Sequence, residues 1–385
     1  MIQPAWRTGA VLLLAVVLCA ARSASGLDHV VLNRDGKTLR LDGRSMIVAQ
    51  DGSCMFQTRD GVIWLAKADE VGERSSDDAP FEPYTSEELA ARLLAELPAG
   101  FDIYYTANYV VCHNTSRGYA LWCGALLERL HSAFTNFWSR KGFELKQPEF
   151  PLVACVFADK GSYSRFALPE LGEAVNSVVA YYSLRTNRIT MYDLSGIESS
   201  GGPTSRMNSA AQINRILSRP SAAPMVATIV HEATHQIAFN CGLHQRYSDC
   251  PLWFSEGIAM YFETPDLSST RGWRSIGEIN KLRLDQFRNY QRRRPPDSLQ
   301  KLVTSDGRLR DTATAVDAYA EAWALTYFLL QQKTEAYVQY LQTLSKKAPQ
   351  FWDTPETRWS DFRDAFGPDV NQLEVEFQRY LSKLH

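Results

Sequence analysis

The stretch that decides the fold is "TIVHEATHQIAFN", residues 228–240, in which two histidines stand four positions apart. Its apolar residues predict a helix, and Pro224 lies near the expected start. Side chains at positions i and i+4 lie on one side of a helix. His231 and His235 therefore point together and can both reach one Zn²⁺ ion, with Glu232 beside them as a general base. An ordinary helix that carries the pattern by chance is the alternative.

A third ligand is offered by "PLWFSEGIAMYFE", residues 251–263, which predicts a second helix. Glu256 lies in its apolar middle, where a charge is expected to have a partner. Two histidines and one glutamate form a zinc site that leaves a position open for water and substrate. The metzincin pattern HExxHxxGxxH is excluded, because Ala238 and Cys241 stand at its later positions.

Together the two stretches resemble the gluzincin metallopeptidases, the thermolysin and aminopeptidase N type, whose aminopeptidases carry HExxHxWFGN and WLNEGFAxYxE. The chain is most similar to a group of secreted bacterial proteins, regarded as peptidases, whose activity is mostly uncharacterised. The matching residues are Asn240, Trp253, Glu256, Gly257, Ala259, Tyr261 and Glu263. The resemblance implies that His231, His235 and Glu256 bind zinc and that Glu232 is the catalytic base.

The resemblance also implies a tyrosine that stabilises the oxyanion of the reaction. "DAYAEAWALTYFLL", residues 317–330, is similar to the aminopeptidase segment YxKGxxxLxxL, and Tyr319 falls on its catalytic tyrosine. The segment departs from the family at Glu321-Ala322, where lysine and glycine are usual, and a role in the helical core is the alternative for Tyr319. Three residues are lesser candidates for the same role: Tyr261, Tyr327 and His244.

Two further features bear on the ligands and on specificity. Glu263 lies two helical turns after Glu256, so it is expected either to accept a hydrogen bond from a ligand imidazole or to be a surface acid.

Residues 172–210 lack the GxMEN strand with which these aminopeptidases hold the substrate amine, so exopeptidase specificity is not implied. The predicted hairpin 178–193 offers an edge to which an extended peptide can add as a strand.

The N-terminus and the composition predict an exported protein. Residues 1–25 contain Arg7, an apolar run and then small residues, which is typical of a secretory signal peptide. An uncleaved anchor and, less well supported, a lipoprotein at Cys19 are the alternatives. We expect a secreted or periplasmic protein without a membrane span after cleavage. The formal net charge of −2 makes nucleic acid a poor partner.

The mature chain would hold six cysteines, an even number that permits disulfides in an exported protein. Two pairs, Cys241–Cys250 and Cys112–Cys123, close short loops and are the predicted disulfides. The alternative is that several of the six are buried free thiols.

The predicted fold class is α+β, with a mixed sheet packed on the helix at 228–240 and a mainly helical C-terminal part. A small, barrel-like all-β module at 26–75 precedes the metallopeptidase-like domain at 76–385, which divides into an α/β part at 76–220 and a helical part at 221–385. Within these, "GERSSDDAPFEP" predicts a polar linker. "FDIYYTANYVVCH", residues 101–113, predicts one strand.

These patterns predict a secreted zinc metallopeptidase that acts on a peptide or protein substrate. One alternative is a binding protein on a peptidase scaffold with structural zinc, although such a site has no need of Glu232. Another is a zinc amidase that acts on non-peptide amides such as those of cell-wall material. The sequence leaves the substrate, the choice between endo- and exo-cleavage and the oligomeric state open.

Overall fold

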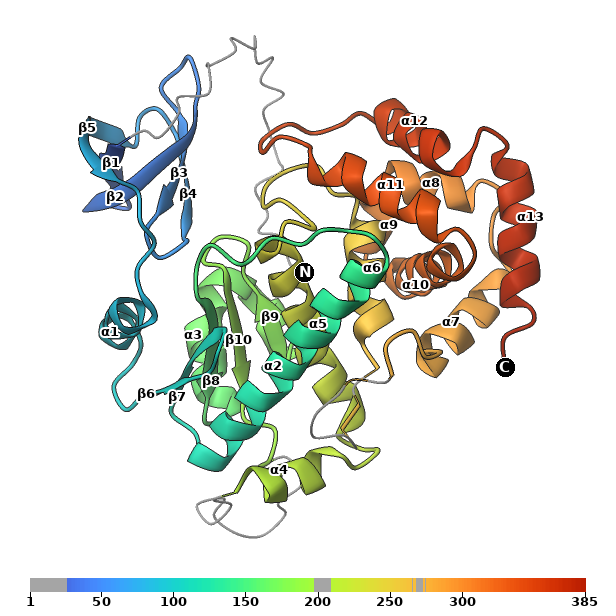
Figure 1. Cartoon of the computed structure of the whole chain (residues 1–385), viewed down its shortest axis with the longest axis horizontal. Coiled ribbons are helices and arrows are strands. Elements are labelled where there is room, and N and C mark those ends of the chain that lie inside the picture. Colours follow the sequence, from blue (N-terminus) through green and yellow to red (C-terminus); the bar gives the residue numbers. More distant parts are fainter. Residues whose placement is uncertain (1–25, 197–208, 265, 268–272, 274) are drawn as a thin grey trace.

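The computed structural model describes residues 26–196, 209–264, 266–267, 273 and 275–385. The predicted signal peptide lies outside the described residues, as does most of the Ser- and Gly-rich segment at 195–210. The described chain is α+β, as predicted: two five-stranded sheets precede a C-terminal part built from helices (Figure 1).

The N-terminal module is a wholly antiparallel sheet in the strand order β4-β3-β2-β1-β5. Its strands are β1 (Gly26–Arg34), β2 (Lys37–Val48), β3 (Cys54–Thr58), β4 (Ile63–Ala66) and β5 (Val71–Pro80). A small core of its own, which includes Leu32 and Phe56, lies apart from the main core of the chain. The predicted all-β module is therefore confirmed, and β4 and β5 form the two edges of its sheet.

The predicted linker after this module is wrong in its first part, because Val71–Pro80 form strand β5. This strand pairs with β1 and extends beyond the predicted boundary at residue 75. Nearly all of its residues are exposed, so the alternation of apolar and polar residues that marks a strand is absent from the sequence.

The second sheet has the order β6-β7-β8-β10-β9 and is mixed, with parallel pairs in its middle and antiparallel pairs at both edges. Its strands are β6 (Asp102–Tyr105), β7 (Tyr109–His113), β8 (Leu152–Phe157), β9 (Ala180–Tyr182) and β10 (Arg188–Tyr192). The single strand predicted at 101–113 is thus a hairpin, β6–β7. The predicted hairpin at 178–193 is confirmed, and Asn187 in its turn has a φ of 62°.

Helices cover this sheet. The first of them are α1 (Ser86–Glu96), α2 (Arg117–Arg140), α3 (Lys160–Leu171) and a 3₁₀ turn, Gly172–Asn176. Helix α1 begins with a capping box between its N-cap, Thr85, and Glu88. Figure 1 shows α5 (Ala223–Asn240) between the sheet and α6 (Leu252–Phe262).

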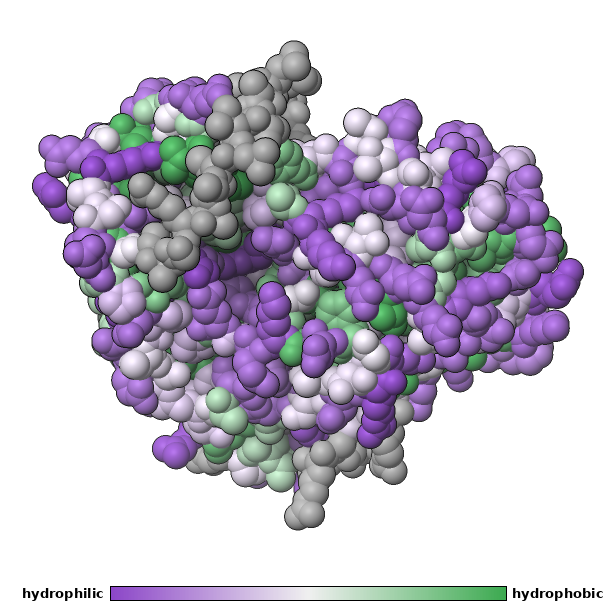
Figure 2. Space-filling view, turned by 45° about the horizontal axis from the view of Figure 1, so that its top comes forward, coloured by the Kyte–Doolittle hydropathy of each residue, from purple (hydrophilic) through white to green (hydrophobic). Residues whose placement is uncertain are grey.

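The C-terminal part is helical, as predicted. After α4 (Ala210–Leu217), α5 and α6, it contains α7 (Lys281–Gln291), α8 (Ser298–Thr304), α9 (Gly307–Arg310), α10 (Ala315–Gln332), α11 (Thr334–Ser345), α12 (Pro355–Phe366) and α13 (Val370–Leu381). Within the described residues, none of these helices combines the length and apolar character needed to cross a membrane. The face in Figure 2 is mainly hydrophilic, with hydrophobic residues in small patches.

The predicted disulfides do not form: all six described cysteines are free thiols. Cys112 on β7 lies in register with Cys155 on β8, whereas Cys123 on α2 faces Met191, with 3.9 Å between the two sulfurs. The Cys250 sulfur contacts the His244 ring at 3.6 Å and not Cys241. Closeness in sequence did not predict which residues these cysteines contact. The strand, the helix and the loop that carry them direct their side chains toward different neighbours.

Candidate metal centre

Helix α5 carries both histidines and is fixed against the second sheet by a buried amide. The Gln236 side chain donates to the backbone carbonyl of Val153 at 3.0 Å and to that of Asn187 at 2.9 Å. Asn240 adds a hydrogen bond to the Asn187 side chain at 2.7 Å. Because the middle of α5 is apolar on several sides, the helix is buried between the sheet and α6.

Helix α6 places Glu256 opposite the histidines because it crosses α10 closely. Gly257 permits this crossing: a Cβ atom there would lie 2.0 Å from the Thr326 hydroxyl and 3.0 Å from the Ala322 carbonyl. Every residue from Leu252 to Phe262 is buried, and Glu256 is fully buried.

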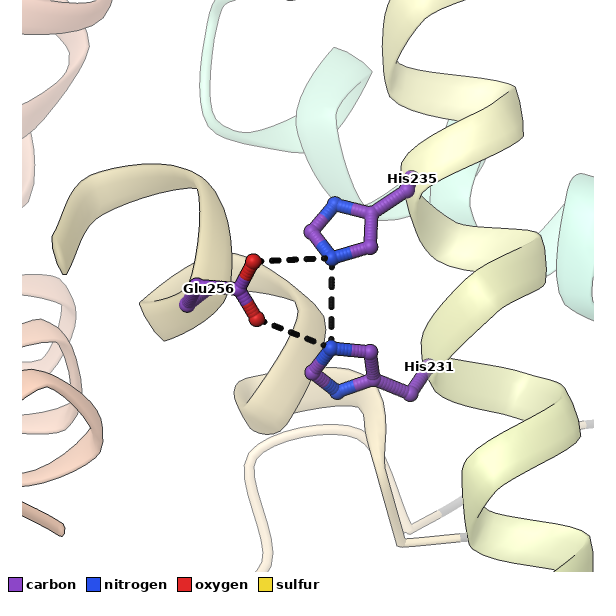
Figure 3. Close-up of side chains that lie close together, drawn as sticks. All are labelled: His231, His235 and Glu256. Carbon is purple, nitrogen blue, oxygen red and sulfur yellow. Dashed lines mark hydrogen bonds and ion pairs between the residues drawn. The ribbon is translucent and has the colours of Figure 1, made fainter. Parts of the chain in front are cut away.

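His231, His235 and Glu256 converge as the sequence predicted (Figure 3). The two imidazole Nε2 atoms are 3.2 Å apart. His231 Nε2 lies 3.1 Å from Glu256 Oε2, and His235 Nε2 lies 3.6 Å from Glu256 Oε1. Ligands at about 2.0–2.1 Å from a tetrahedral zinc ion are about 3.4 Å apart. One ligand atom from each of the three side chains lies within 4.8 Å of the other two, so the group could hold one such ion.

The charges within this group are coupled. Burial lowers the pKa of His231. Its hydrogen bond to Glu256 and the negative charge of that carboxylate raise the pKa by more than burial lowers it, so the pKa of His231 lies above its ordinary value. Burial dominates for His235, whose pKa is lowered. A buried carboxylate between two imidazoles, with one of them neutral, is a donor set suited to a divalent cation.

Glu232 stands beside this group, where the sequence placed it, and is almost fully buried. Its Oε2 accepts a hydrogen bond of 2.8 Å from the backbone N–H of Tyr182, on the edge strand β9. This contact fixes the orientation of the carboxylate and joins the general-base candidate to the strand. The sequence gives no signal for it, because the donor is a backbone group.

Tyr319, on α10, lies within the electrostatic reach of both candidate carboxylates. The charge of Glu256, then burial, then the charge of Glu232 raise the pKa of Tyr319, so its hydroxyl stays protonated. The Arg283 guanidinium lies 5.8 Å from the Tyr319 ring centre. A protonated hydroxyl near the three candidate ligands is able to donate a hydrogen bond to a developing oxyanion.

The structure gives Glu263 other partners than a ligand imidazole. Its carboxylate accepts from Asn280 at 3.3 Å and from Arg283 at 3.4 Å. It is neither bonded to His231 nor a plain surface acid, because its side chain is only 14% exposed. The predicted contact with a ligand is therefore wrong, and Glu263 instead positions Arg283 beside Tyr319.

The lesser oxyanion candidates are engaged elsewhere. The Tyr261 hydroxyl accepts from Gln331 at 3.1 Å, and the Tyr327 ring packs against Tyr261 at 5.9 Å. His244 is buried between Phe239 and Phe254. Burial lowers its pKa to about 3, so His244 is neutral and carries no charge to an oxyanion.

Comparison with known proteins identifies one region. Residues 225–350 match a family model described as "Protein of unknown function (DUF1570)". This span, less than half of the chain, contains the three predicted ligands, Glu232 and Tyr319. A comparison with curated proteins gives no match.

Proposed function

We propose that the protein is an exported zinc metallopeptidase of the gluzincin type that hydrolyses peptide bonds. The observation that carries the proposal is the convergence of His231, His235 and Glu256 at ligand-to-ligand distances of 3.1–3.6 Å, with Glu232 beside them. A structural zinc site has no need of an additional carboxylate at this place, which favours an enzyme over a binding protein with structural zinc.

His231, His235 and Glu256 would hold the ion. Zinc in such a site lowers the pKa of the attacking water and polarises the substrate carbonyl. Glu232 accepts the proton of that water and passes it to the leaving amine. The backbone N–H of Tyr182 donates a hydrogen bond to Glu232 Oε2 and keeps the carboxylate oriented during both proton transfers. Tyr319 donates a hydrogen bond to the oxyanion.

The edge strand β9 supplies a place for the peptide. The Ser183 N–H bonds to the Arg188 carbonyl, so the backbone groups of Tyr182 face away from β10, toward Glu232. Ala180, two residues earlier, faces the same way. A peptide that adds to this edge as a further strand runs past Glu232, which brings its backbone to the base.

The test compares two acids that differ in role, Glu256 on α6 and Glu263 at the C-cap of that helix. Glu256→Gln removes a proposed ligand, whereas Glu263→Gln changes a carboxylate two turns further that bonds to Arg283. We expect the wild type to hold one zinc ion per chain and to cleave casein or a peptide library. Glu256→Gln should lose zinc and cleavage, and Glu263→Gln should keep zinc.

Cleavage that continues after zinc is removed would overturn the proposal. Zinc binding without cleavage of any peptide would favour a hydrolase of non-peptide amides or a binding protein. Export is tested separately, by the N-terminal sequence of the mature chain, which we expect to begin near residue 25.

A further inference from the structure

The hairpin β9–β10 is attached to helix α5 beside the proposed metal centre. The ring of Tyr182, on β9, stacks on Phe239 of α5 with 5.8 Å between the ring centres. The backbone N–H of Tyr182 donates to Glu232, the proposed base. Strand β9 is only three residues long and lies at the edge of its sheet, so within the described chain β10 is its one neighbouring strand. The place of Tyr182 therefore depends on what holds the rest of the hairpin.

The turn of this hairpin also contacts the N-terminal module. Residues 59–62, the β3–β4 turn, connect two strands of the module. Ile63, which follows this turn and begins the edge strand β4, donates its backbone N–H to the Arg185 carbonyl at 2.8 Å. Arg188, at the start of β10, lies 4.0 Å from Asp60 in the β3–β4 turn. The module therefore reaches the hairpin by a backbone hydrogen bond and by an ion pair.

A buried arginine joins the same two segments more firmly. Arg246 is only 8% exposed, and its guanidinium donates to the Gly61 carbonyl at 2.9 Å and to the Leu184 carbonyl at 3.1 Å. Hydrogen bonds from a charged donor are stronger than neutral ones, and both carbonyls would lose a partner if this donor were removed. Arg246 thus ties the β3–β4 turn to the hairpin two residues after Tyr182.

The β3–β4 turn packs closely on the chain that precedes β8. Gly61 has a φ of 82°, and a Cβ atom there would lie 3.1 Å from the Phe150 ring. Phe150 is buried and precedes the central strand of the second sheet. A glycine is needed both for the positive φ and for this close approach. The turn therefore has a fixed place from which it can hold the hairpin.

We propose that the N-terminal module is a positioning element for the proposed base. Its β3–β4 turn, through Arg246 and Ile63, holds the hairpin from which Tyr182 orients Glu232. The inference rests on the proposed function, because it takes Glu232 as the base. The alternative, a module that binds substrate independently of the site, predicts that these contacts have no effect on the base.

The test compares two arginines at the boundary between the module and the rest of the chain. Arg246→Met removes both donations to the turn and the hairpin, whereas Arg246→Lys keeps a charged donor. The matched control is Arg44→Met. Arg44 donates to Glu149 at 2.7 and 2.6 Å and to Gln57 at 3.0 Å, and neither acceptor belongs to the hairpin. The control therefore loosens the module without changing a contact of the hairpin.

Two readouts are measured on the mature protein. The first is amide hydrogen exchange of residues 180–184, which needs no activity, and the second is kcat for peptide cleavage. We expect Arg246→Met to speed this exchange at least several-fold and to lower kcat roughly 10- to 100-fold with unchanged zinc content, because small displacements of a working group have effects of this size. Arg246→Lys should recover part of both losses, and Arg44→Met should behave as the wild type.

Gly61→Ala tests the same contact from the module and keeps the proposal testable if Arg246→Met fails to fold. The new methyl group would crowd Phe150 and shift the β3–β4 turn. Exchange in the hairpin should rise and kcat should fall, as in Arg246→Met.

Several outcomes would contradict the proposal. Unchanged exchange in Arg246→Met and Gly61→Ala would show that the module does not hold the hairpin. Faster exchange with unchanged kcat would show that the base does not depend on the hairpin. Equal losses in Arg44→Met would mean that any loosening of the module has the same effect. If the wild type cleaves no peptide, the proposed function fails and the role of Glu232 with it, whereas exchange still decides whether the module holds the hairpin.

Discussion

Replacing Gly257 by alanine should loosen the metal centre without touching a ligand. The new methyl group would lie 2.0 Å from the Thr326 hydroxyl, about 1.4 Å short of an ordinary contact. Rotating the Thr326 side chain relieves that contact only, because the Thr326 Cβ and the Ala322 carbonyl oxygen would still lie at 3.0 Å. Helices α6 and α10 must therefore separate by several tenths of an ångström or more.

The expected cost has two parts. Overpacking of this kind lowers the free energy of unfolding by about 1–3 kcal/mol, which urea unfolding of the metal-free protein measures. Glu256, the neighbour of Gly257, moves with α6, and metal sites tolerate only about 0.2 Å of change in ligand distance. We expect zinc affinity to fall roughly 10- to 100-fold, the range found when groups that orient ligands are changed. Competition with a zinc chelator measures this loss.

The control is Thr326→Ala, alone and combined with Gly257→Ala. It removes the closest contact, so the double variant should recover part of both losses, and the coupling between the two changes should be favourable. Stability within about 0.5 kcal/mol of the wild type together with unchanged zinc affinity in Gly257→Ala would refute the idea that this crossing positions Glu256.

Three other perturbations follow from the same geometry. Tyr319→Phe should lower kcat about 10²- to 10³-fold with unchanged zinc content, and an unaltered kcat would remove Tyr319 from the oxyanion role. His244, whose pKa burial lowers to about 3, binds its proton more tightly in the unfolded chain, so stability should fall as pH drops below 6.5. The loss between pH 7 and pH 5 should be about 2 kcal/mol, and His244→Gln should abolish that share in urea unfolding at the two pH values. Arg358→Met leaves Asp249 and Asp306 without their buried partner and should cost about 3–5 kcal/mol of unfolding free energy; a cost below 1 kcal/mol would show that water compensates the two acids.

The convergence of the three candidate ligands could be predicted because much of its geometry is local. His231 and His235 are one helical turn apart, and that spacing alone brings their rings together once the helix forms. Glu256 was identified by a motif and by its apolar neighbours, which require a partner for its charge. The hairpin at 178–193 was found for the same reason: two apolar runs flank Asn187, a residue that tolerates a positive φ.

Features set by distant parts of the chain were missed. Strand β5 is exposed and polar, so only its pairing with β1 makes it a strand. The predicted cysteine pairs failed because β7 and β8 bring Cys112 beside Cys155, a neighbour 43 residues away in sequence. The hydrogen bond from Tyr182 to Glu232 joins a backbone group of one element to a side chain of another, and no residue pattern encodes it.

The central claim is that a zinc ion held by His231, His235 and Glu256 works with Glu232 as the base. The most direct measurement is the zinc content and peptide cleavage of the mature protein beside a Glu232→Gln variant. We predict one zinc ion per chain in both proteins, cleavage by the wild type, and loss of cleavage in the variant. A wild-type protein that neither contains nor takes up zinc, or a variant that cleaves as fast as the wild type, would contradict the account.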